Sequence, residues 1–184
     1  MSAAAGAVGS IAGQLAGIVG CRAVGIAGGP EKCALVTSEL GFDVVVDYKA
    51  EGWREALARA TPEGLDVDFE NVGGKVMQAM LSRMNWFGRV ALCGLISGYN
   101  QEGLTADDFL PIMMCRLQMR GFIVTDHAAR WADAVGVLAG LVVEGKLQHR
   151  ETVVNGFENA PAALRRLFDG STTGKLVTRV DRAA

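Results

Sequence analysis

Residues 3–20 read AAAGAVGSIAGQLAGIVG, a turn of small residues that runs directly into an apolar helix. Ala4, Gly6 and Gly9 have the spacing of the fingerprint GxGxxG, with alanine at its first position. In that fingerprint one glycine makes the turn, one lets backbone approach a pyrophosphate, and one lets the helix pack on a strand. The stretch therefore predicts a phosphate-binding loop at the head of a helix. The plainer alternative is that small residues only permit close helix–strand packing.

Short strand-like runs and helical runs alternate after this loop. We expect strands over 21–27, 43–47, 65–70 and 89–95, and helices over 30–40, 52–60 and 75–84. Strand and helix alternating at this spacing predict an α/β fold with a doubly wound parallel sheet. The near-continuous Val, Ile and Leu runs fit strands that are buried on both faces.

The alternation of strands and helices is less regular after residue 95. We expect a loop over 96–108, a helix over 109–116, a strand over 117–125 and a helix over 131–144. The last part, 152–180, predicts a short strand, a helix over 160–168, a glycine-rich turn and a strand over 176–180. On this pattern we divide the chain into a nucleotide-binding domain, 1–147, and a C-terminal segment, 148–184.

The composition excludes several classes of function. The chain has 184 residues and a formal net charge of −2, which argues against nucleic acid as a partner. Its four cysteines form no CxxC pair and its two histidines lie far apart, so we expect no disulfide framework and no metal site. We find no signal peptide, and charge, Gly or Gln interrupts each apolar run before the roughly 20 residues that a membrane span needs. We therefore expect a cytoplasmic protein with no membrane partner.

The tip of the second expected strand indicates which dinucleotide is preferred. NAD enzymes place an acidic residue there to bind the adenosine ribose. Here the tip reads Ile26-Ala27-Gly28-Gly29, without a carboxylate, and Lys32 follows with a positive charge. We expect Glu31 to face outward in the first turn of the next helix, where the helix dipole favours an acid. NADP(H) is therefore favoured over NAD(H).

Seven motifs together resemble one family. They are AAAGAVGS, GIAGGPEK, VDYK, FENVGG, LCGLISGYN, GFIV and GFENAPAALRRLFDG…GK, and they run in order from residue 2 to residue 181. This set resembles the zinc-independent medium-chain dehydrogenases/reductases, and within them the prostaglandin reductase (leukotriene B4 12-hydroxydehydrogenase) and curcumin reductase branch. The resemblance implies NADPH-dependent reduction of the C=C bond of α,β-unsaturated ketones and aldehydes.

The resemblance also implies which residues surround the cofactor. They are Gly6, Ala7, Val8 and Gly9 at the pyrophosphate; Gly28, Lys32 and Tyr48 at the adenosine phosphate end; Asn71 beside the cofactor; Cys93, Gly94, Leu95, Ile96 and Ser97 around the nicotinamide half; and Phe122, Ile123 and Val124 against the nicotinamide. Several of these have plain alternatives, with Tyr48 as a strand-end aromatic and Asn71 as a turn former.

Two further positions carry chemistry by the same resemblance. Tyr99 is implied to be catalytic, since a phenol can hydrogen-bond the oxygen on which negative charge develops during reduction. The alternative for Tyr99 is an ordinary loop tyrosine. Thr172 stands where the family usually has a cofactor-contacting asparagine, and a hydroxyl can replace only one of the hydrogen bonds of an amide.

Members of the family carry a barrel-like substrate domain and the first strand of a Rossmann-type nucleotide-binding domain ahead of this loop. We therefore expect the first strand to be missing here, which would leave two strand edges unpaired and apolar surface exposed. We expect these edges to be covered by a partner chain, a rearranged strand or a separately supplied N-terminal fragment. The segment 148–184 is implied to belong to the substrate-binding catalytic domain, so its apolar residues are expected to lack cover. The strand Met119–Thr125, together with its neighbours, is implied to form the seam of a homodimer.

Two functions remain open on this reasoning. The chain is either the cofactor-binding part of an enone reductase or a non-catalytic NADP-binding or association module. A short-chain dehydrogenase is disfavoured because that class needs YxxxK, whereas Tyr48 and Tyr99 are followed four residues later by glycine.

Overall fold

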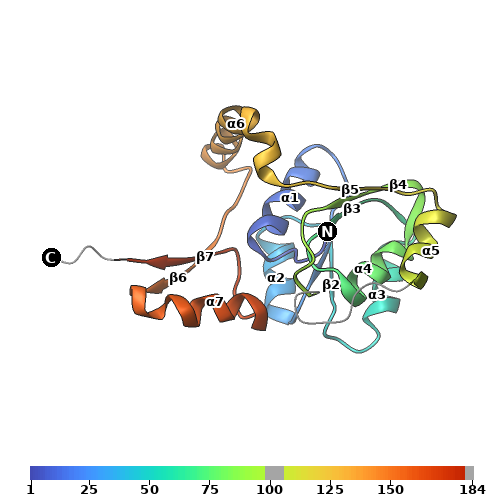
Figure 1. Ribbon diagram of the computed structural model, residues 1–184, viewed down its shortest axis with the longest axis horizontal. Helices are drawn as coiled ribbons and strands as arrows, with labels where there is room; N and C mark the ends of the chain where they lie inside the picture. The colour runs from blue at the N-terminus through green and yellow to red at the C-terminus, as the bar shows by residue number, and fades with distance from the viewer. Residues whose placement is uncertain (98–105, 181–184) are drawn as a thin grey trace.

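The computed structural model describes residues 1–97 and 106–180, arranged as a twisted parallel sheet between layers of helices with a separate tail (Figure 1). The strands of the main sheet are β1 (Val24–Ala27), β2 (Val44–Asp47), β3 (Leu65–Glu70), β4 (Met84–Leu92) and β5 (Gln118–Gly121). The helices between them are α1 (Ala7–Ile18), α2 (Pro30–Ser38), α3 (Trp53–Ala60), α4 (Gly74–Leu81) and α5 (Ala106–Met114). The expected doubly wound α/β fold is confirmed.

The two halves of the main sheet, β2–β1 and β3–β4–β5, are joined by the first four residues. The backbone N–H of Ile26 donates to the Met1 carbonyl at 2.9 Å, and Ala4 donates to Ile26 at 3.0 Å. On the other side, the N–H of Ser2 donates to the Phe69 carbonyl at 3.3 Å. Of the three expected ways to cover the two edges, the structure shows the chain's own residues, because residues 1–4 bond to both neighbouring strands.

Buried side chains cover both faces of β1. Ala23, Ala27, Val36 and Phe42 form a core on the side of α1 and α2. On the other face, Val24 and Ile26 pack with side chains of α3 and α4, and a third cluster around Met77, Leu81, Val90 and Leu117 continues the core toward β5. Burial on both faces explains why β1 contains no polar side chain.

Two expected strands end earlier than the sequence suggested. The strand expected over 89–95 begins earlier, at Met84, and ends at Leu92, because Cys93 and Gly94 both donate their N–H groups to the Glu70 carbonyl and turn the chain away. Its neighbour, expected over 117–125, stops at Gly121 because β4 offers no partner beyond Leu92. The chain then forms a 3₁₀ helix, η2 (Val124–Arg130). The helix α5 begins at Ala106, inside the span expected to be a loop.

The tail follows the helix α6 (Trp131–Val143) and contains β6 (Glu151–Asn155), η3 (Phe157–Asn159), α7 (Ala160–Asp169) and β7 (Lys175–Arg179). β6 and β7 form a separate parallel pair. The tail is held to the main sheet by the N–H of Gly174, which donates to the Ala5 carbonyl at 2.8 Å. Figure 1 shows α7 in the tail, with one end beside α2.

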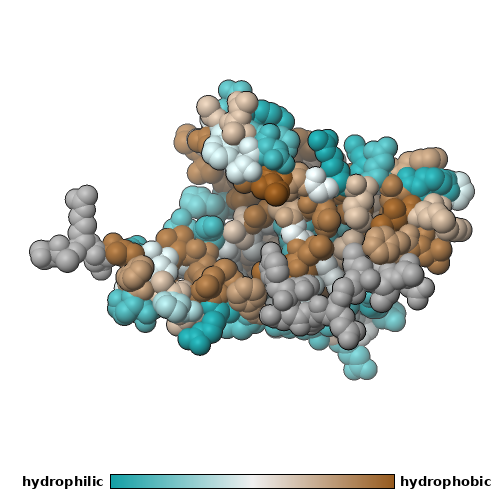
Figure 2. Space-filling model, viewed as in Figure 1, coloured by the Kyte–Doolittle hydropathy of each residue, from teal (hydrophilic) through white to brown (hydrophobic). Residues whose placement is uncertain are grey.

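Much apolar surface is exposed over α5 and the tail (Figure 2). Met113 is 66% exposed on α5, and Phe157, Leu164 and Phe168 are 71%, 58% and 57% exposed in the tail. The expectation that the tail's apolar residues lack cover is met for these side chains. Among the helices of the described residues, none has the length and hydropathy of a membrane span.

Candidate functional site

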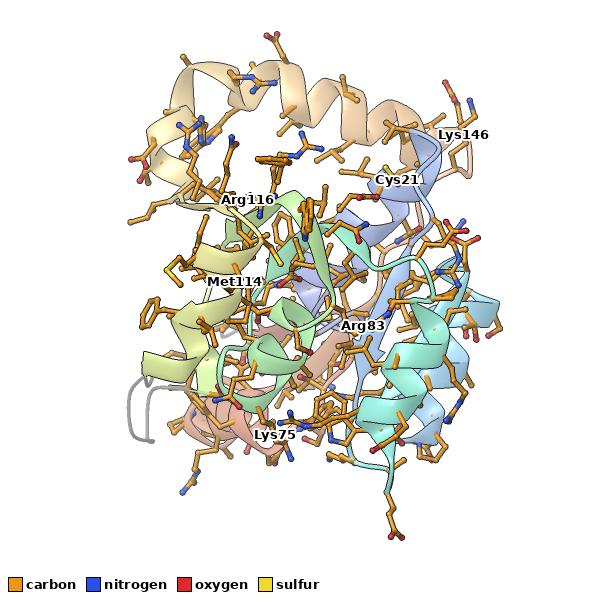
Figure 3. The ribbon with its side chains drawn as sticks, turned by 90° about the vertical axis from the view of Figure 1, so that its right-hand side faces the viewer. Cys21, Lys75, Arg83, Met114, Arg116 and Lys146 are labelled. Carbon is orange, nitrogen blue, oxygen red and sulfur yellow. The ribbon has the colours of Figure 1, made fainter. Side chains whose placement is uncertain are left out.

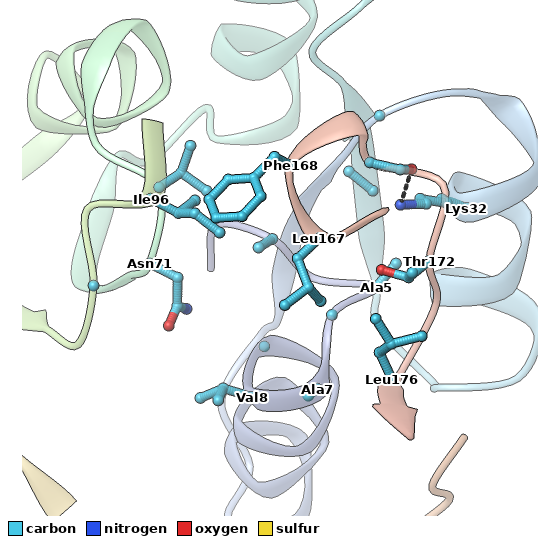
Figure 4. A pocket seen from close by; sticks show the side chains of 18 of the residues that line it. Ala5, Ala7, Val8, Lys32, Asn71, Ile96, Leu167, Phe168, Thr172 and Leu176 are labelled. Atoms are coloured by element: carbon cyan, nitrogen blue, oxygen red, sulfur yellow. Dashed lines mark hydrogen bonds between the residues drawn. The ribbon is translucent and has the colours of Figure 1, made fainter. Parts of the chain in front are cut away.

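A cavity of about 820 Å³ opens at the carboxyl ends of the parallel strands, between the main sheet and the tail (Figure 4). It is lined from the head of α1, the tips of β1 and β3, the loop after β4, and helix α7. In open parallel sheets, ligands bind at this edge where the strand order reverses. Residues 1–4 lie between β1 and β3, so the head of α1 occupies that position.

The head of α1 provides a site for an anion. Gly6 is the N-cap, and Ala7, Val8 and Gly9 follow in the first turn, which contains no acidic residue. The N–H groups of a first turn have no acceptor within their own helix, and the helix dipole adds partial positive charge there. Gly6 through Gly9 all line the cavity, so these donors lie at its wall.

Gly9 also permits the close approach of α1 to the first residues of the chain. A Cβ atom at this position would lie 2.3 Å from the carbonyl oxygen of Ala3 and 3.0 Å from that of Ser2. Gly13, one turn later, faces the ring of Phe42, which a Cβ would meet at 1.9 Å. The packing alternative is therefore supported at Gly9 and Gly13, and Gly9 also lines the cavity, where phosphate binding stays a prediction.

The tip of β1 is covered by residues that follow β2. A Cβ on Gly28 would lie 2.7 Å from Cε1 of the Tyr48 ring, so glycine leaves room for that ring. The Asp47 carboxylate lies near the tip, but its Oδ1 accepts the N–H groups of Gly29 and Lys49, each at 2.9 Å. Asp47 therefore fixes the turn that presents Tyr48 and does not line the cavity.

Lys32 lies at the same end of the cavity and reaches the tail. Its ammonium donates a 2.6 Å hydrogen bond to the carbonyl of Gly170 at the end of α7 (Figure 4). Partial burial lowers the pKa of Lys32, and the positive charge of Lys49 lowers it further, whereas Asp169 acts in the opposite direction. Glu31 is exposed and does not line this cavity, as expected.

The tip of β3 is organised by the buried carboxylate of Glu70. Its Oε1 accepts hydrogen bonds from the Ser2 hydroxyl at 2.8 Å, from the N–H of Val72, and from that of Gly73 at 2.9 Å. The Ser2 hydroxyl oxygen in turn accepts the N–H of Asn71 at 2.7 Å. These bonds fix the backbone of Asn71, whose side chain lines the cavity (Figure 4).

The loop after β4 is attached to the same turn. Ile96 donates its N–H to the Asn71 carbonyl at 3.2 Å, and both the N–H and the hydroxyl of Ser97 donate to the Val72 carbonyl. Burial raises the pKa of the Cys93 thiol at the start of this loop. The loop and the β3 tip therefore form one wall opposite Lys32.

The structure brings most of the predicted cofactor residues to this cavity. Its lining includes Gly6, Ala7, Val8, Gly9, Gly28, Lys32, Tyr48, Asn71, Cys93, Gly94, Leu95, Ile96, Ser97 and Thr172. Phe122, Ile123 and Val124 are not part of that lining. Phe122 instead makes an edge-on contact with Phe69 at 5.9 Å, and Ile123 and Val124 are 67% and 64% exposed. Tyr99 lies outside the described residues.

Sequence reasoning missed the contribution of α7. Leu164, Leu167 and Phe168 line the cavity, with Phe168 beside Ile96 and Leu167 between Asn71 and Thr172 (Figure 4). The strongly amphipathic pattern of this helix was the available signal, but it does not say which surface the apolar face meets. Lys49 was missed as well, although it follows Tyr48 directly.

The described residues contain no group of three or more His, Cys, Asp and Glu side chains that could hold a metal ion. The donors on the cavity wall are instead backbone N–H groups, amines, an amide and hydroxyls. Such a set suits a long ligand with phosphate groups near its middle and at one end.

Comparison with known proteins agrees with the geometry. A sequence model of the zinc-binding dehydrogenase family matches residues 7–140. The NADPH-dependent curcumin reductase of Escherichia coli (strain K12) is 42% identical over 98% of this chain and 54% of its own length. The NADP(+)-dependent 2-alkenal reductase of Nicotiana tabacum is 41% identical over 99% of this chain and 54% of its own length.

A similar solved structure is that of CurA from Vibrio vulnificus in complex with NADPH. It superposes with a TM-score of 0.93 and 41% sequence identity, covering 99% of this chain and 56% of that chain. The chain thus spans about half the length of the curated relatives it matches. These findings confirm the family resemblance inferred from the seven motifs.

Proposed function

The chain belongs to the zinc-binding dehydrogenase family, and on that premise we propose that it binds NADP(H) in the cavity at the head of α1. We propose further that it supplies the cofactor-binding part of an enzyme that reduces the C=C bond of α,β-unsaturated ketones or aldehydes. The relatives named as NADPH-dependent curcumin reductase and NADP(+)-dependent 2-alkenal reductase support this substrate class.

The observation that carries the proposal is the order of donors along the cavity. Lys32 and Tyr48 lie at one end, the first turn of α1 lies at the wall between, and Asn71 and Ile96 lie at the other end. This order matches a 2′-phosphate, a diphosphate and a nicotinamide in sequence. The β1 tip contributes no carboxylate that would oppose a 2′-phosphate. The nearby carboxylate of Asp47, at the end of β2, is occupied by two backbone amides.

The residues of the chain have separate tasks in this scheme. NADPH, when bound, supplies the hydride for the β-carbon of the alkene. The first-turn amides of α1 bind the diphosphate, and the wall formed by Asn71 and Ile96 orients the nicotinamide. Leu167 and Phe168 exclude water from that side. We retain Tyr99 as the proposed donor to the substrate carbonyl oxygen, where a hydroxyl stabilises the charge that develops during reduction.

A second candidate function is a non-catalytic NADP-binding or association module. It is favoured by the cavity lining, since the predicted residues found there are cofactor-binding ones, which support binding without requiring turnover. This candidate uses the same cofactor residues and gives no role to Tyr99. It predicts binding without turnover even when a substrate domain is supplied as a separate polypeptide.

The test measures binding and turnover separately. NADPH and NADH are titrated against the purified chain and followed by nicotinamide fluorescence, and we expect the tighter binding with NADPH. NADPH oxidation with an enone is then measured, with and without the separately expressed substrate domain of a relative. Absence of NADPH binding would refute the proposed function. Binding with turnover only after addition of the domain would favour the reductase over the module.

We also propose that the chain forms a homodimer through β5. This strand is the last of the order β3–β4–β5, so within the described residues its outer edge has no strand partner. Just before it, the Arg116 guanidinium lies 4.5 Å from the ring of Trp86 and 4.8 Å from that of Phe87, both more than 60% exposed. Figure 3 shows Arg116 next to the end of α5. Exposed aromatic and Arg side chains are enriched at interfaces. Light scattering of the wild-type protein and of Trp86→Asp tests whether the dimer forms and whether it uses this surface.

Two smaller proposals complete the assignment. We place the boundary between the nucleotide-binding domain and the C-terminal segment at residue 147, just before the chain enters β6. We propose a cytoplasmic location, because a reducing compartment suits a chain whose four cysteines are all free thiols. Limited proteolysis tests the first proposal and cell fractionation tests the second.

A further inference from the structure

Three lysines, Lys32, Lys49 and Lys75, lie near the end of the cavity that Tyr48 lines. Lys32 and Lys49 line the cavity, and the Lys75 ammonium lies 5.8 Å from the centre of the Tyr48 ring without being part of the lining. The ion pairs within the described part of the chain are Lys146–Glu144 and Arg150–Glu39. None of the three lysines therefore has a carboxylate partner among the described residues.

Lys32 alone is a weak counterion for a phosphate monoester. Such a group carries about −1.5 to −2 charges at pH 7. The Lys32 ammonium already gives one of its three donors to Gly170, which leaves fewer donors for the phosphate. A second cation is needed to balance the charge of this end of the ligand.

The backbone and the stem of Lys49 are arranged to provide that cation. The N–H of Lys49 is held by Asp47 Oδ1 at 2.9 Å, the same oxygen that holds the N–H of Gly29. The Lys49 stem crosses the tip of β1, where a Cβ on Gly28 would lie 3.1 Å from its Cε. The turn therefore lays Lys49 over the strand tip at which NAD enzymes carry an acid.

We infer that Lys49 is the second cation for the 2′-phosphate and a specificity-determining residue for NADP(H) over NAD(H). The inference rests on the proposed function of the cavity. Lys32 then shares its donors between the phosphate and Gly170, whereas Lys49 gives its charge to the phosphate alone. Lys75 lies outside the cavity lining and is given no contact with the phosphate.

The experiment measures the dissociation constants of NADPH and NADH for wild-type, Lys49→Ala and Lys75→Ala proteins by nicotinamide fluorescence. A charged hydrogen bond is worth enough to change an affinity about tenfold or more. We expect Lys49→Ala to weaken NADPH binding by about that factor and to change NADH binding less than about twofold. Lys49→Arg keeps the charge and should retain most of the preference. Lys75→Ala should leave the ratio of the two constants nearly unchanged.

Controls separate this inference from folding and from the proposed function. Lys146→Ala removes a lysine that lies at the opposite end of the molecule from Lys75 in Figure 3 and is paired with Glu144. Circular dichroism checks that each variant is folded, and 2′,5′-ADP as a competitor reports the phosphate contact alone. If wild type binds NADPH but Lys49→Ala keeps the ratio, or if Lys75→Ala lowers it equally, the inference is overturned and the proposed function stands. Failure of wild type to bind NADPH overturns both.

Discussion

Lys32 and Gly170 are 138 residues apart in sequence, yet the Lys32 ammonium donates a 2.6 Å hydrogen bond to the Gly170 carbonyl. Gly170 ends helix α7 with a φ of +72°, a left-handed conformation that glycine adopts without strain. The bond therefore joins the lysine proposed to bind the 2′-phosphate to the end of the tail helix that closes the cavity.

Replacing Lys32 by Ala should weaken NADPH binding about ten- to a hundredfold, since a charge-assisted hydrogen bond to the phosphate is lost. NADH lacks that phosphate, so its affinity should change much less. Fluorescence titration with both nucleotides checks the result. Equal weakening of both would indicate that Lys32 acts through the tail and not through the phosphate.

Replacing Gly9 by Ala should strongly destabilise the loop at the head of α1, because the new methyl group would overlap the Ala3 carbonyl at 2.3 Å. The matched control is Gly17→Ala in the same helix, where nothing lies within 4 Å of the added atom. Alanine is the better helix former, so Gly17→Ala should stabilise by about 0.5–1 kcal/mol. Thermal unfolding of both variants checks the contrast, and similar melting temperatures would contradict it.

Asp68 should make the stability of the protein depend on pH. Its carboxyl oxygens are buried without hydrogen-bond partners, and burial raises its pKa to about 7, with Glu70 acting in the same direction and the Met1 ammonium opposing. The folded state therefore keeps this proton at pH values where the unfolded chain has lost it. Stability should fall as pH rises from about 4 to about 7 and then change no further through this group.

The variant Asp68→Asn cannot ionise and tests this dependence. Its free energy of unfolding should match that of wild type near pH 4 and exceed that of wild type near pH 8. Urea unfolding at both pH values provides the measurement. If wild type were instead more stable than Asp68→Asn at pH 8, Asp68 would be stabilised as a carboxylate.

Gln14 should hold the tail in place through its side-chain amide. Its Nε2 donates to the Gln148 carbonyl at 2.8 Å, and its Oε1 accepts the Gln148 N–H at 2.7 Å. We expect Gln14→Leu to cost about 1–3 kcal/mol, since partly buried backbone groups lose their partners. The Gln148→Ala control keeps those backbone groups and should cost little. Hydrogen exchange at β6 and β7 checks whether the tail opens, and unchanged protection would exclude this role.

Thr172→Asn should tighten NADPH binding about two- to tenfold, because an amide offers a donor and an acceptor where the hydroxyl satisfies one contact. Thr172 lines the cavity beside Lys32 and Leu176 (Figure 4). Thr172→Val serves as the opposite control and should weaken binding. If Thr172→Asn binds NADPH less tightly than wild type, the hydroxyl makes the better contact at this position.

Local patterns in the sequence determined the alternation of strands and helices and the loop ending at Gly9. The sequence also shows directly that the strand tip around Gly28 carries no acid. Periodicity, glycine spacing and residue type can all be recognised within a few neighbouring residues. The ends of β4 and β5 were predicted less well, since Gly94 turns the chain through a hydrogen bond to Glu70, which belongs to another strand.

Tertiary structure alone decided which distant segments meet. It placed residues 1–4 between β1 and β3, brought Phe168 of the tail over the cavity, and set Lys49 beside Lys32. It also buried Asp68, whose position in a strand gave no sign of its surroundings. The physical reason is that a residue's neighbours across the fold depend on hydrogen bonds such as Gly174 to Ala5, which no local pattern of charge or hydropathy encodes.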